Sequence, residues 1–342
     1  MKRALLATLT RDAVVDFLRP LRPRAASVFC LHRFADPDLG NEGHDLAALR
    51  RNLAFLRRHR VPVVSLSDLV TTLERGEQPR PGTVVFTIDD GYADFANAAA
   101  PIFAEFDCPA TVFVVTGFLD GGLWLWWDRI EYIFRETDRT GIALDIEGVP
   151  YRGQWSTPRE RQSEAERLAE ALEAISDESK QRILVEIATT LEVTPPETPP
   201  ARFAAMSWDD ARRCERMGVT FGPHTVTHPI LSRVSDDAAA FEIRESWRRL
   251  REQMAAPTSV FCYPNGGAPT FGERERRLVR DGGLRAAVTT ARRYVTQKEF
   301  AAGADARFVL PRFAYYDDLP HFAQPVSGVE RVKSMVRALG TR

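Results

Sequence analysis

The stretch Thr83-Val-Val-Phe-Thr-Ile-Asp-Asp-Gly91 decides the fold class of this chain of 342 residues. Its first six residues are apolar or β-branched, which predicts a buried strand over 83–88. Asp89 and Asp90 follow where that strand ends, and Gly91 lets the backbone turn sharply beside them. Two adjacent carboxylates repel each other, so we expect a cation or a division of roles at this turn. Taken alone, Asp89-Asp90-Gly91 is equally typical of an Asp-Gly turn that caps a helix.

Strand-like and helix-like segments alternate on both sides of this stretch. Further strands are expected at 27–31, 61–65, 111–116, 219–222, 259–263 and 286–290, and helices at 46–59, 66–75, 93–106, 208–217, 235–254 and 273–281. Such alternation predicts an α/β fold built on a parallel sheet or barrel. In folds of this kind the chemistry lies at the C-terminal ends of the strands.

One long segment, 119–205, breaks the alternation. It holds a Trp-rich stretch, a charged amphipathic stretch over 158–191 and a Pro-rich turn. We interpret it as a helical insertion in a domain that covers 27–330. An N-terminal helical extension over 1–26 and a C-terminal tail over 331–342 complete the predicted organisation.

The composition excludes several classes of protein. Lys plus Arg is 46 and Asp plus Glu is 47, so no overall field draws the chain toward nucleic acid. Four widely spaced cysteines predict neither a disulfide framework nor a thiolate zinc site. Arg11 and Asp12 interrupt the first apolar run, which is too short for a signal peptide, so we expect a cytoplasmic protein. The apolar side of residues 1–20 predicts either peripheral membrane contact or a docking helix.

A second motif, His224-Thr-Val-Thr-His228-Pro229, follows the strand expected at 219–222. Two imidazoles four residues apart suit a divalent metal, and Pro229 pushes His228 out of helical conformation. A histidine pair alone is as typical of a hydrogen-bonded turn as of a metal site. Together with the diacid, however, two imidazoles and one carboxylate match a catalytic zinc site, and the second carboxylate would be a general base.

Three motifs now stand in one order along the chain. They are Thr87-Ile-Asp-Asp-Gly91, Gly222-Pro-His-Thr-Val-Thr-His228 and Tyr263-Pro-Asn-Gly266, with Leu31-His-Arg33, Pro109-Ala-Thr-Val-Phe113 and Leu310-Pro-Arg-Phe313 as flanks. This set resembles the polysaccharide deacetylases, the NodB homology family or carbohydrate esterase family 4. The resemblance covers about 27–315, with the insertion outside it.

The resemblance implies a distorted (β/α)7-type barrel that removes N-acetyl groups from sugars. It implies a divalent metal, with zinc favoured, held by Asp90, His224 and His228, and it makes Asp89 the general base. The expected substrate is an N-acetylated saccharide or a lipid-linked sugar precursor. Two alternatives stay open: a hydrolase of another carbon–nitrogen bond on the same barrel, and a non-catalytic glycan-binding relative.

The turn Pro264-Asn265-Gly266 is either a plain turn or, by the resemblance, the source of an oxyanion-binding N–H at Asn265. Tyr92, beside the diacid, is a second candidate for substrate contact. In the family the third motif begins with an arginine that pairs with the catalytic aspartate, and Cys262 occupies that place here. Arg312 is the candidate substitute, and its alternative is a structural ion pair.

Two histidines compete for the role of general acid. His32 ends the first predicted strand, whereas His321 has the more family-like C-terminal position. His44 and His59 are expected to be solvated. The segment Leu123-Trp-Leu-Trp-Trp-Asp128 predicts either indole rings over sugar faces or, as we favour, the buried start of the insertion.

Overall fold

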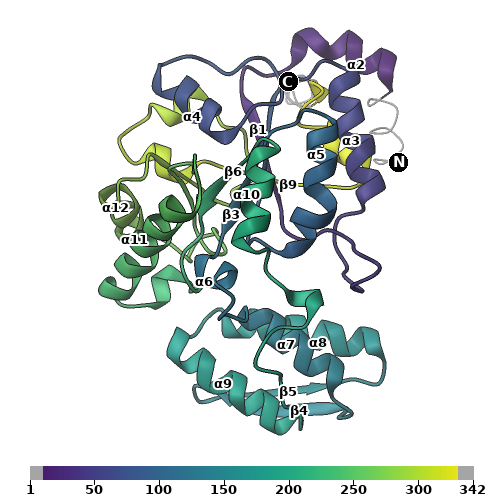
Figure 1. Ribbon diagram of the computed structural model, residues 1–342, viewed down its shortest axis with the longest axis vertical. Coiled ribbons are helices and arrows are strands. Elements are labelled where there is room, and N and C mark those ends of the chain that lie inside the picture. Colours follow the sequence, from purple (N-terminus) through teal and green to yellow (C-terminus); the bar gives the residue numbers. More distant parts are fainter. Residues whose placement is uncertain (1–10, 330–342) are drawn as a thin grey trace, which may run out of the picture.

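The computed structural model describes residues 11–329 of the chain (Figure 1). The predicted C-terminal tail over 331–342 lies outside the described residues. The first ten residues of the predicted extension over 1–26, and of the segment 1–20 considered for membrane contact, also lie outside them. No helix between residues 11 and 329 combines the length and the apolar character needed to cross a membrane.

Parallel strands form the centre of the molecule. A five-stranded sheet has the order β6-β3-β2-β1-β9, and a second sheet pairs β7 with β8. The bounds are β1 Ala26–Leu31, β2 Thr83–Ile88, β3 Ala110–Val114, β6 Val219–Pro223, β7 Val260–Cys262, β8 Ala286–Val288 and β9 Phe313–Ala314. Every one of these pairings is parallel. The predicted α/β class with a parallel sheet is therefore confirmed.

The two sheets are joined into a ring. The N–H of Thr258, just before β7, donates to the carbonyl of Phe221 in β6 at 2.7 Å. On the other side, Leu310 bridges Val288 of β8, and the chain then runs into β9, which pairs with β1. This order is the one expected of a distorted barrel.

Helices cover the outside of this ring. They are α2 Asp12–Leu18, α3 Leu46–Arg58, α4 Leu66–Glu74, α5 Ala100–Glu105, α6 Thr116–Leu119, α10 Trp208–Arg216, α11 Asp236–Gln253, α12 Glu273–Asp281, α13 Gln297–Phe300 and α14 Leu319–Ala323. Polar caps fix where several of them begin. The Asp45 carboxylate accepts from the Ala48 N–H at the start of α3, and Ser207 and Asp210 form a capping box at α10.

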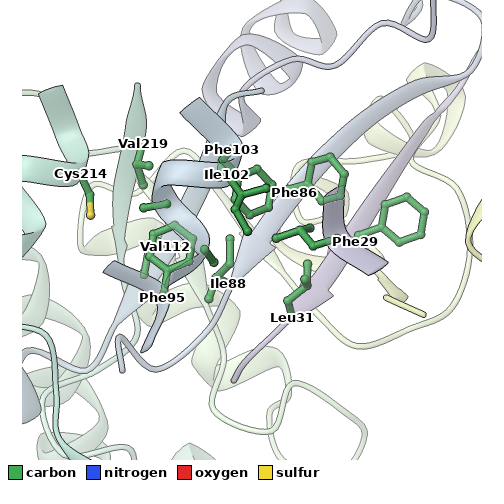
Figure 2. Close-up of a cluster of buried hydrophobic side chains, with 14 of the residues drawn as sticks. Phe29, Leu31, Phe86, Ile88, Phe95, Ile102, Phe103, Val112, Cys214 and Val219 are labelled. Carbon is green, nitrogen blue, oxygen red and sulfur yellow. The ribbon is translucent and has the colours of Figure 1, made fainter. Parts of the chain in front are cut away.

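Both faces of the strands are buried. On the outer face, Phe29 of β1, Phe86 of β2 and Val112 of β3 lie in one cluster with Phe103 of α5 and Cys214 of α10 (Figure 2). The alternate residues face the inside of the ring, where Val28, Val85, Phe113, Cys262 and Val288 form another cluster. Burial on both faces accounts for strand sequences that are apolar throughout rather than alternating.

Two of the predicted elements differ from the structure in more than their end residues. The strand predicted over 61–65 is wrong: Val63 makes a single bridge to β2, because Ser65 already caps α4 and leaves too few residues for a ladder. The helix predicted over 93–106 begins with a π-helical turn, Phe95–Ala99, before α5.

A separate unit, which we call the inserted subdomain (126–190), lies between β3 and β6. It consists of α7 Trp126–Glu136, the antiparallel hairpin of β4 Gly141–Ile146 and β5 Val149–Gln154, then α8 Pro158–Leu172 and α9 Asp177–Thr190 (Figure 1). It has its own buried cluster, which includes Ile130, Ile142, Leu168 and Leu184. The hairpin was not predicted, although residues 141–146 alternate between buried and exposed.

The chain that leaves the inserted subdomain passes the turn after β2. Ala205 forms an antiparallel bridge with Tyr92, and the N–H of Met206 donates to the Gly91 carbonyl at 2.9 Å. The inserted subdomain is thereby tied to the diacid turn of the barrel.

The expectation that His59 is solvated is wrong. Its side chain is 1% exposed, with Nε2 3.0 Å from an Asp12 carboxylate oxygen and Nδ1 2.9 Å from one of Asp16. These contacts dock α2 on α3. His44 is half-buried, and its Nδ1 lies 3.0 Å from Asp317.

Candidate active site

A cavity of about 620 Å³ opens between the C-terminal ends of the barrel strands and the inserted subdomain. The barrel contributes His32, Asp89, Asp90, Tyr92, His224, His228, Tyr263 and Asn265 to its lining, and the inserted subdomain contributes Trp126, Trp127, Asp128, Glu131, Gln162, Glu166, Ala169, Glu170 and Glu173. The predicted position of the chemistry, at strand ends, therefore coincides with a cavity large enough for a sugar residue.

Three potential metal ligands meet at the floor of this cavity. The Nε2 atoms of His224 and His228 lie 3.2 Å apart, and the Asp90 Oδ1 atom is 3.6 and 3.7 Å from them. All three side chains are buried. The spacing of their ligand atoms is compact enough for one ion to contact all three.

The hydrogen bonding of His224 fits a metal ligand. Its Nδ1 atom lies 2.8 Å from the Cys262 carbonyl, which can only accept, so Nδ1 carries a hydrogen and Nε2 is the ring atom that faces Asp90 and His228. Burial opposes a charge on this ring, but Cys262 and the Asp90 carboxylate outweigh it and raise the pKa of His224 well above its ordinary value. Burial and the neighbouring His224 ring lower the pKa of His228 to about 3, so this ring is neutral. Two neutral imidazole nitrogens and a carboxylate are the donor set of zinc.

The backbone around these ligands is strained. Asp90, His228 and Asn265 adopt positive φ values of 75°, 59° and 61°. Such values are uncommon outside glycine and cluster at functional sites. As predicted from Pro229, His228 is not helical.

A carboxylate from a neighbouring helix holds the histidine loop in place. Glu242 of α11 accepts hydrogen bonds from the N–H groups of Val226 (2.7 Å) and Thr227 (3.0 Å) and from the Thr227 hydroxyl (2.7 Å). Glu242 was not predicted from the sequence, because a glutamate on a charged helix carries no signal of its partner in the fold.

Asp89 faces a different environment from Asp90. Its two carboxylate oxygens accept from the two terminal nitrogens of Arg312 at 2.7 and 2.8 Å. The thiols of Cys30 and Cys262 lie 3.4 and 3.6 Å from its Oδ2 atom. Burial opposes ionisation, but the Arg312 guanidinium outweighs it and holds the pKa of Asp89 well below its ordinary value.

Arg312 is itself fixed in the barrel interior. It is 1% exposed, and it donates to the Thr289 carbonyl (3.1 Å) and to the Thr87 hydroxyl (3.1 Å). A buried arginine therefore reaches Asp89 from the segment before β9, and the small side chain of Cys262 lies beside it with its Sγ 3.3 Å from Nη2.

The two histidines considered as general acids lie in different places. His32 lines the cavity, with its side chain 54% exposed and its Nε2 3.7 Å from the Asp89 Oδ2 atom. His321 lies on α14, where its Nδ1 is 2.5 Å from Asp318 and its ring packs against Tyr316. His321 is not among the residues that line the cavity, so the structure brings only His32 to the site.

The predicted substrate contacts are only partly brought together. Tyr92 and Asn265 line the cavity, whereas Pro264 and Gly266 flank Asn265 without lining it. The Tyr92 hydroxyl donates to Asp128 at 2.8 Å and accepts from Trp127 Nε1 at 2.9 Å.

The Trp-rich segment contributes both to the core of the inserted subdomain and to the cavity lining. Trp126 lies in the core of the inserted subdomain. The Trp127 and His228 rings form a T-shaped pair with centroids 4.6 Å apart, and Trp127 lines the cavity. Asp128 was missed, although a carboxylate directly after a run of tryptophans expected to be buried is itself a signal of a buried polar site.

The sequence matches the family model described as polysaccharide deacetylase over residues 76–186 and 198–287, together more than half of the chain. The match therefore includes part of the segment 119–205 that the sequence analysis placed outside the resemblance. No curated protein sequence matches the chain significantly.

Solved structures share the fold. The Streptococcus pyogenes deacetylase PplD in complex with acetate is 16% identical with a TM-score of 0.57, over 89% of this chain and 98% of that chain. IcaB from Ammonifex degensii is 17% identical with a TM-score of 0.55, over 90% and 98% of the two chains. A de-N-acetylase from Aggregatibacter actinomycetemcomitans is 13% identical with a TM-score of 0.52, over 86% and 95%.

Proposed function

The chain belongs to the polysaccharide deacetylase family, and from that premise we propose that it hydrolyses the N-acetyl group of an amino sugar in a glycan, using a divalent cation. Asp90, His224 and His228 would hold the cation, and zinc is the ion that this donor set favours. The observation that carries the proposal is the convergence of these three ligands beside Asp89 in one cavity.

The side chains divide the chemistry among them. When bound, the cation would polarise the acetamide carbonyl and make a water molecule more acidic. Asp89 accepts the proton of the attacking water through its carboxylate, which Arg312 keeps ionised and oriented. The N–H of Asn265 donates to the developing oxyanion, a contact typically worth about 2.7–4 kcal/mol. His32, which lines the cavity, would return a proton to the leaving amine.

The form of the substrate stays a prediction. A free N-acetylated saccharide and a lipid-linked sugar precursor both present the acetamide group that this site would hydrolyse. Co-sedimentation of the full chain with anionic lipid vesicles tests the predicted membrane contact through residues 1–20.

Acetate release from N-acetylated oligosaccharides tests the proposal. We expect release that stops after chelation and returns with zinc, and metal content that is lost when His224 and His228 are replaced. Intact metal binding without acetate release from any N-acetylated sugar would contradict deacetylation. Hydrolysis of a different amide under those conditions would support the other carbon–nitrogen hydrolase considered above.

A further inference from the structure

The imidazole of His228 lacks the hydrogen bond that the other histidine ligand has. His224 donates from Nδ1 to the Cys262 carbonyl at 2.8 Å. The Nε2 atom of His228 faces His224 and Asp90, at 3.2 and 3.7 Å, so a neutral ring in this orientation carries its hydrogen on Nδ1. That Nδ1 atom is buried and has no hydrogen-bond partner among residues 11–329. Histidines that bind a metal almost always donate this hydrogen to an acceptor, so the Nδ1–H of His228 needs an explanation.

The backbone contacts of the histidine loop do not orient this ring. Glu242 holds the loop through two backbone N–H groups, and His228 has a positive φ of 59°. Neither feature reaches the imidazole, so its orientation has to come from the side chains packed against it. Two rings pack there: those of His224 and Trp127, with centroids 4.7 and 4.6 Å from that of His228.

The indole ring of Trp127 is the neighbour that the inserted subdomain contributes. Its plane makes an angle of 72° with that of His228, which is a T-shaped arrangement. In such a pair the edge of one ring points at the face of the other. The face of an aromatic ring carries partial negative charge and accepts hydrogen from an N–H group, although more weakly than an oxygen atom does. The indole can therefore supply the acceptor that His228 otherwise lacks.

A hydrogen-bonded network holds Trp127 in this position. Its Nε1 donates to the Tyr92 hydroxyl at 2.9 Å, and that hydroxyl donates to Asp128 at 2.8 Å. Trp127 and Asp128 are consecutive residues in the first turn of α7, so both hydrogen bonds fasten that turn to the barrel. The Tyr92 ring is itself covered by the Arg33 guanidinium, whose central carbon lies 3.9 Å from the ring centroid. The position of the indole is thus set from its Nε1 edge.

Tyr92 has a different role in this network from the substrate contact predicted for it. It is 2% exposed, and the single hydrogen of its hydroxyl goes to Asp128, so none is left for a sugar. Tyr92 follows Asp90 by two residues. The network therefore connects the turn of one metal-ligand candidate to the ring of another.

We infer that Trp127 is a positioning residue for His228: its indole face accepts the Nδ1–H of that imidazole and sets the direction in which Nε2 points. The inference rests on the metal site of the proposed function. It makes the inserted subdomain part of that metal site as well as of the cavity lining, because the residue that orients one ligand belongs to α7.

Zinc affinity tests the inference without turnover. The full chain is titrated with zinc against a chromophoric chelator as wild type, Trp127→Leu and Trp127→Phe. Both variants remove the indole N–H and keep an apolar side chain, so they differ mainly in the aromatic face. We expect about ten-fold weaker zinc binding in Trp127→Leu, and affinity within about three-fold of wild type in Trp127→Phe. Equal zinc affinity in the two variants would overturn the inference.

Trp124→Leu is the matched control. Trp124 belongs to the same Trp-rich segment, packs against Tyr132 and Phe203, and is not among the residues that line the cavity. We expect this variant to bind zinc as wild type does. A loss as large as that in Trp127→Leu would mean that zinc affinity follows the general packing of the segment, and the inference would fall.

The imidazole proton gives a second readout that needs no variant to fold. In the zinc-loaded wild-type protein with isotopically labelled histidine, the Nδ1–H of His224 should resonate downfield, because it is bonded to a carbonyl. The Nδ1–H of His228 should lie upfield of it, because the ring current of the indole shields a proton above its face. A His228 proton as far downfield as that of His224 would indicate an oxygen acceptor and contradict the inference.

Metal content and acetate release separate this inference from the proposed function. Bound zinc without acetate release from any N-acetylated sugar would overturn deacetylation, while the comparison of Trp127→Leu with Trp127→Phe would still decide on the positioning role. A wild-type protein that binds no zinc would overturn the metal site, and the inference with it.

Discussion

Arg312 and Asp89 form a buried, bidentate ion pair with nitrogen–oxygen distances of 2.7 and 2.8 Å. The arginine comes from the segment before β9, whereas the third motif carries Cys262 at the position where the family has its arginine. In this chain a guanidinium therefore reaches Asp89 from another part of the barrel. The pairing orients both oxygens of the proposed base.

Replacing Arg312 by alanine should both destabilise the protein and abolish most activity. Removing one partner of a buried ion pair costs about 3–5 kcal/mol, because the remaining charge is left unpaired. Chemical denaturation and acetate release measure the two effects. Arg292→Ala, at an exposed position, is the control. Wild-type kcat in Arg312→Ala would show that the pair is only structural.

Replacing Asp89 and replacing Asp90 should have different effects on turnover and on bound zinc. Asp89→Asn leaves the three ligands in place, so we expect retained zinc and a loss of kcat of about 10²–10⁴-fold, the usual contribution of general base catalysis. Asp90→Asn should lower the bound zinc instead. Metal analysis beside acetate release separates the two. Unchanged turnover in Asp89→Asn would rule out its role as base.

The general acid can be assigned by paired variants. His32→Gln should lower kcat by about 10²-fold or more, since a positioned acid contributes that much. His321→Gln should leave kcat near wild type, because His321 pairs with Asp318 outside the cavity. Steady-state kinetics on one N-acetylated substrate decides between them. A low kcat in His321→Gln together with a wild-type kcat in His32→Gln would make His321 the general acid instead.

Glu242 should act on metal affinity through the loop that it holds. In Glu242→Gln an amide replaces a carboxylate that accepts three hydrogen bonds, so we expect about 10–100-fold weaker zinc binding, as for other residues that position ligands. A competition assay with a chromophoric chelator measures it. Glu245→Gln, on the same helix but paired with Arg248 at the surface, is the control. Equal zinc affinity in both variants would show that the loop is held by other contacts.

Local sequence signals predicted the barrel strands and the motifs that end on them. The strand expected at 83–88 coincides with β2, because a strand buried on both faces reads as one apolar run. The histidine pair was named from its spacing and its position after a strand, and the family resemblance implied Asp90 as the third ligand. The structure gathers all three in one place.

Other features depend on contacts between distant segments and left weak signals. Glu242 and Asp128 owe their roles to what the fold places opposite them, and His59 is buried because α2 docks over it. The β4–β5 hairpin was missed because the charged segment after it suggested helices throughout the insertion. Arg312 could be named only as a candidate, since neither charge nor position distinguishes it from the other arginines of the chain.

The hydrogen bond from Met206 to Gly91 has a consequence for how this chain can diversify. The segment between β3 and β6 begins and finishes beside neighbouring strands, so it can be lengthened, shortened or exchanged without reordering the barrel. However, the C-terminal end of this segment is hydrogen-bonded to the turn that carries Asp89 and Asp90. A graft that kept residues 204–206 would change the side chains that surround the proposed substrate. A graft that replaced those residues would remove the contacts that hold the turn of Asp89 and Asp90.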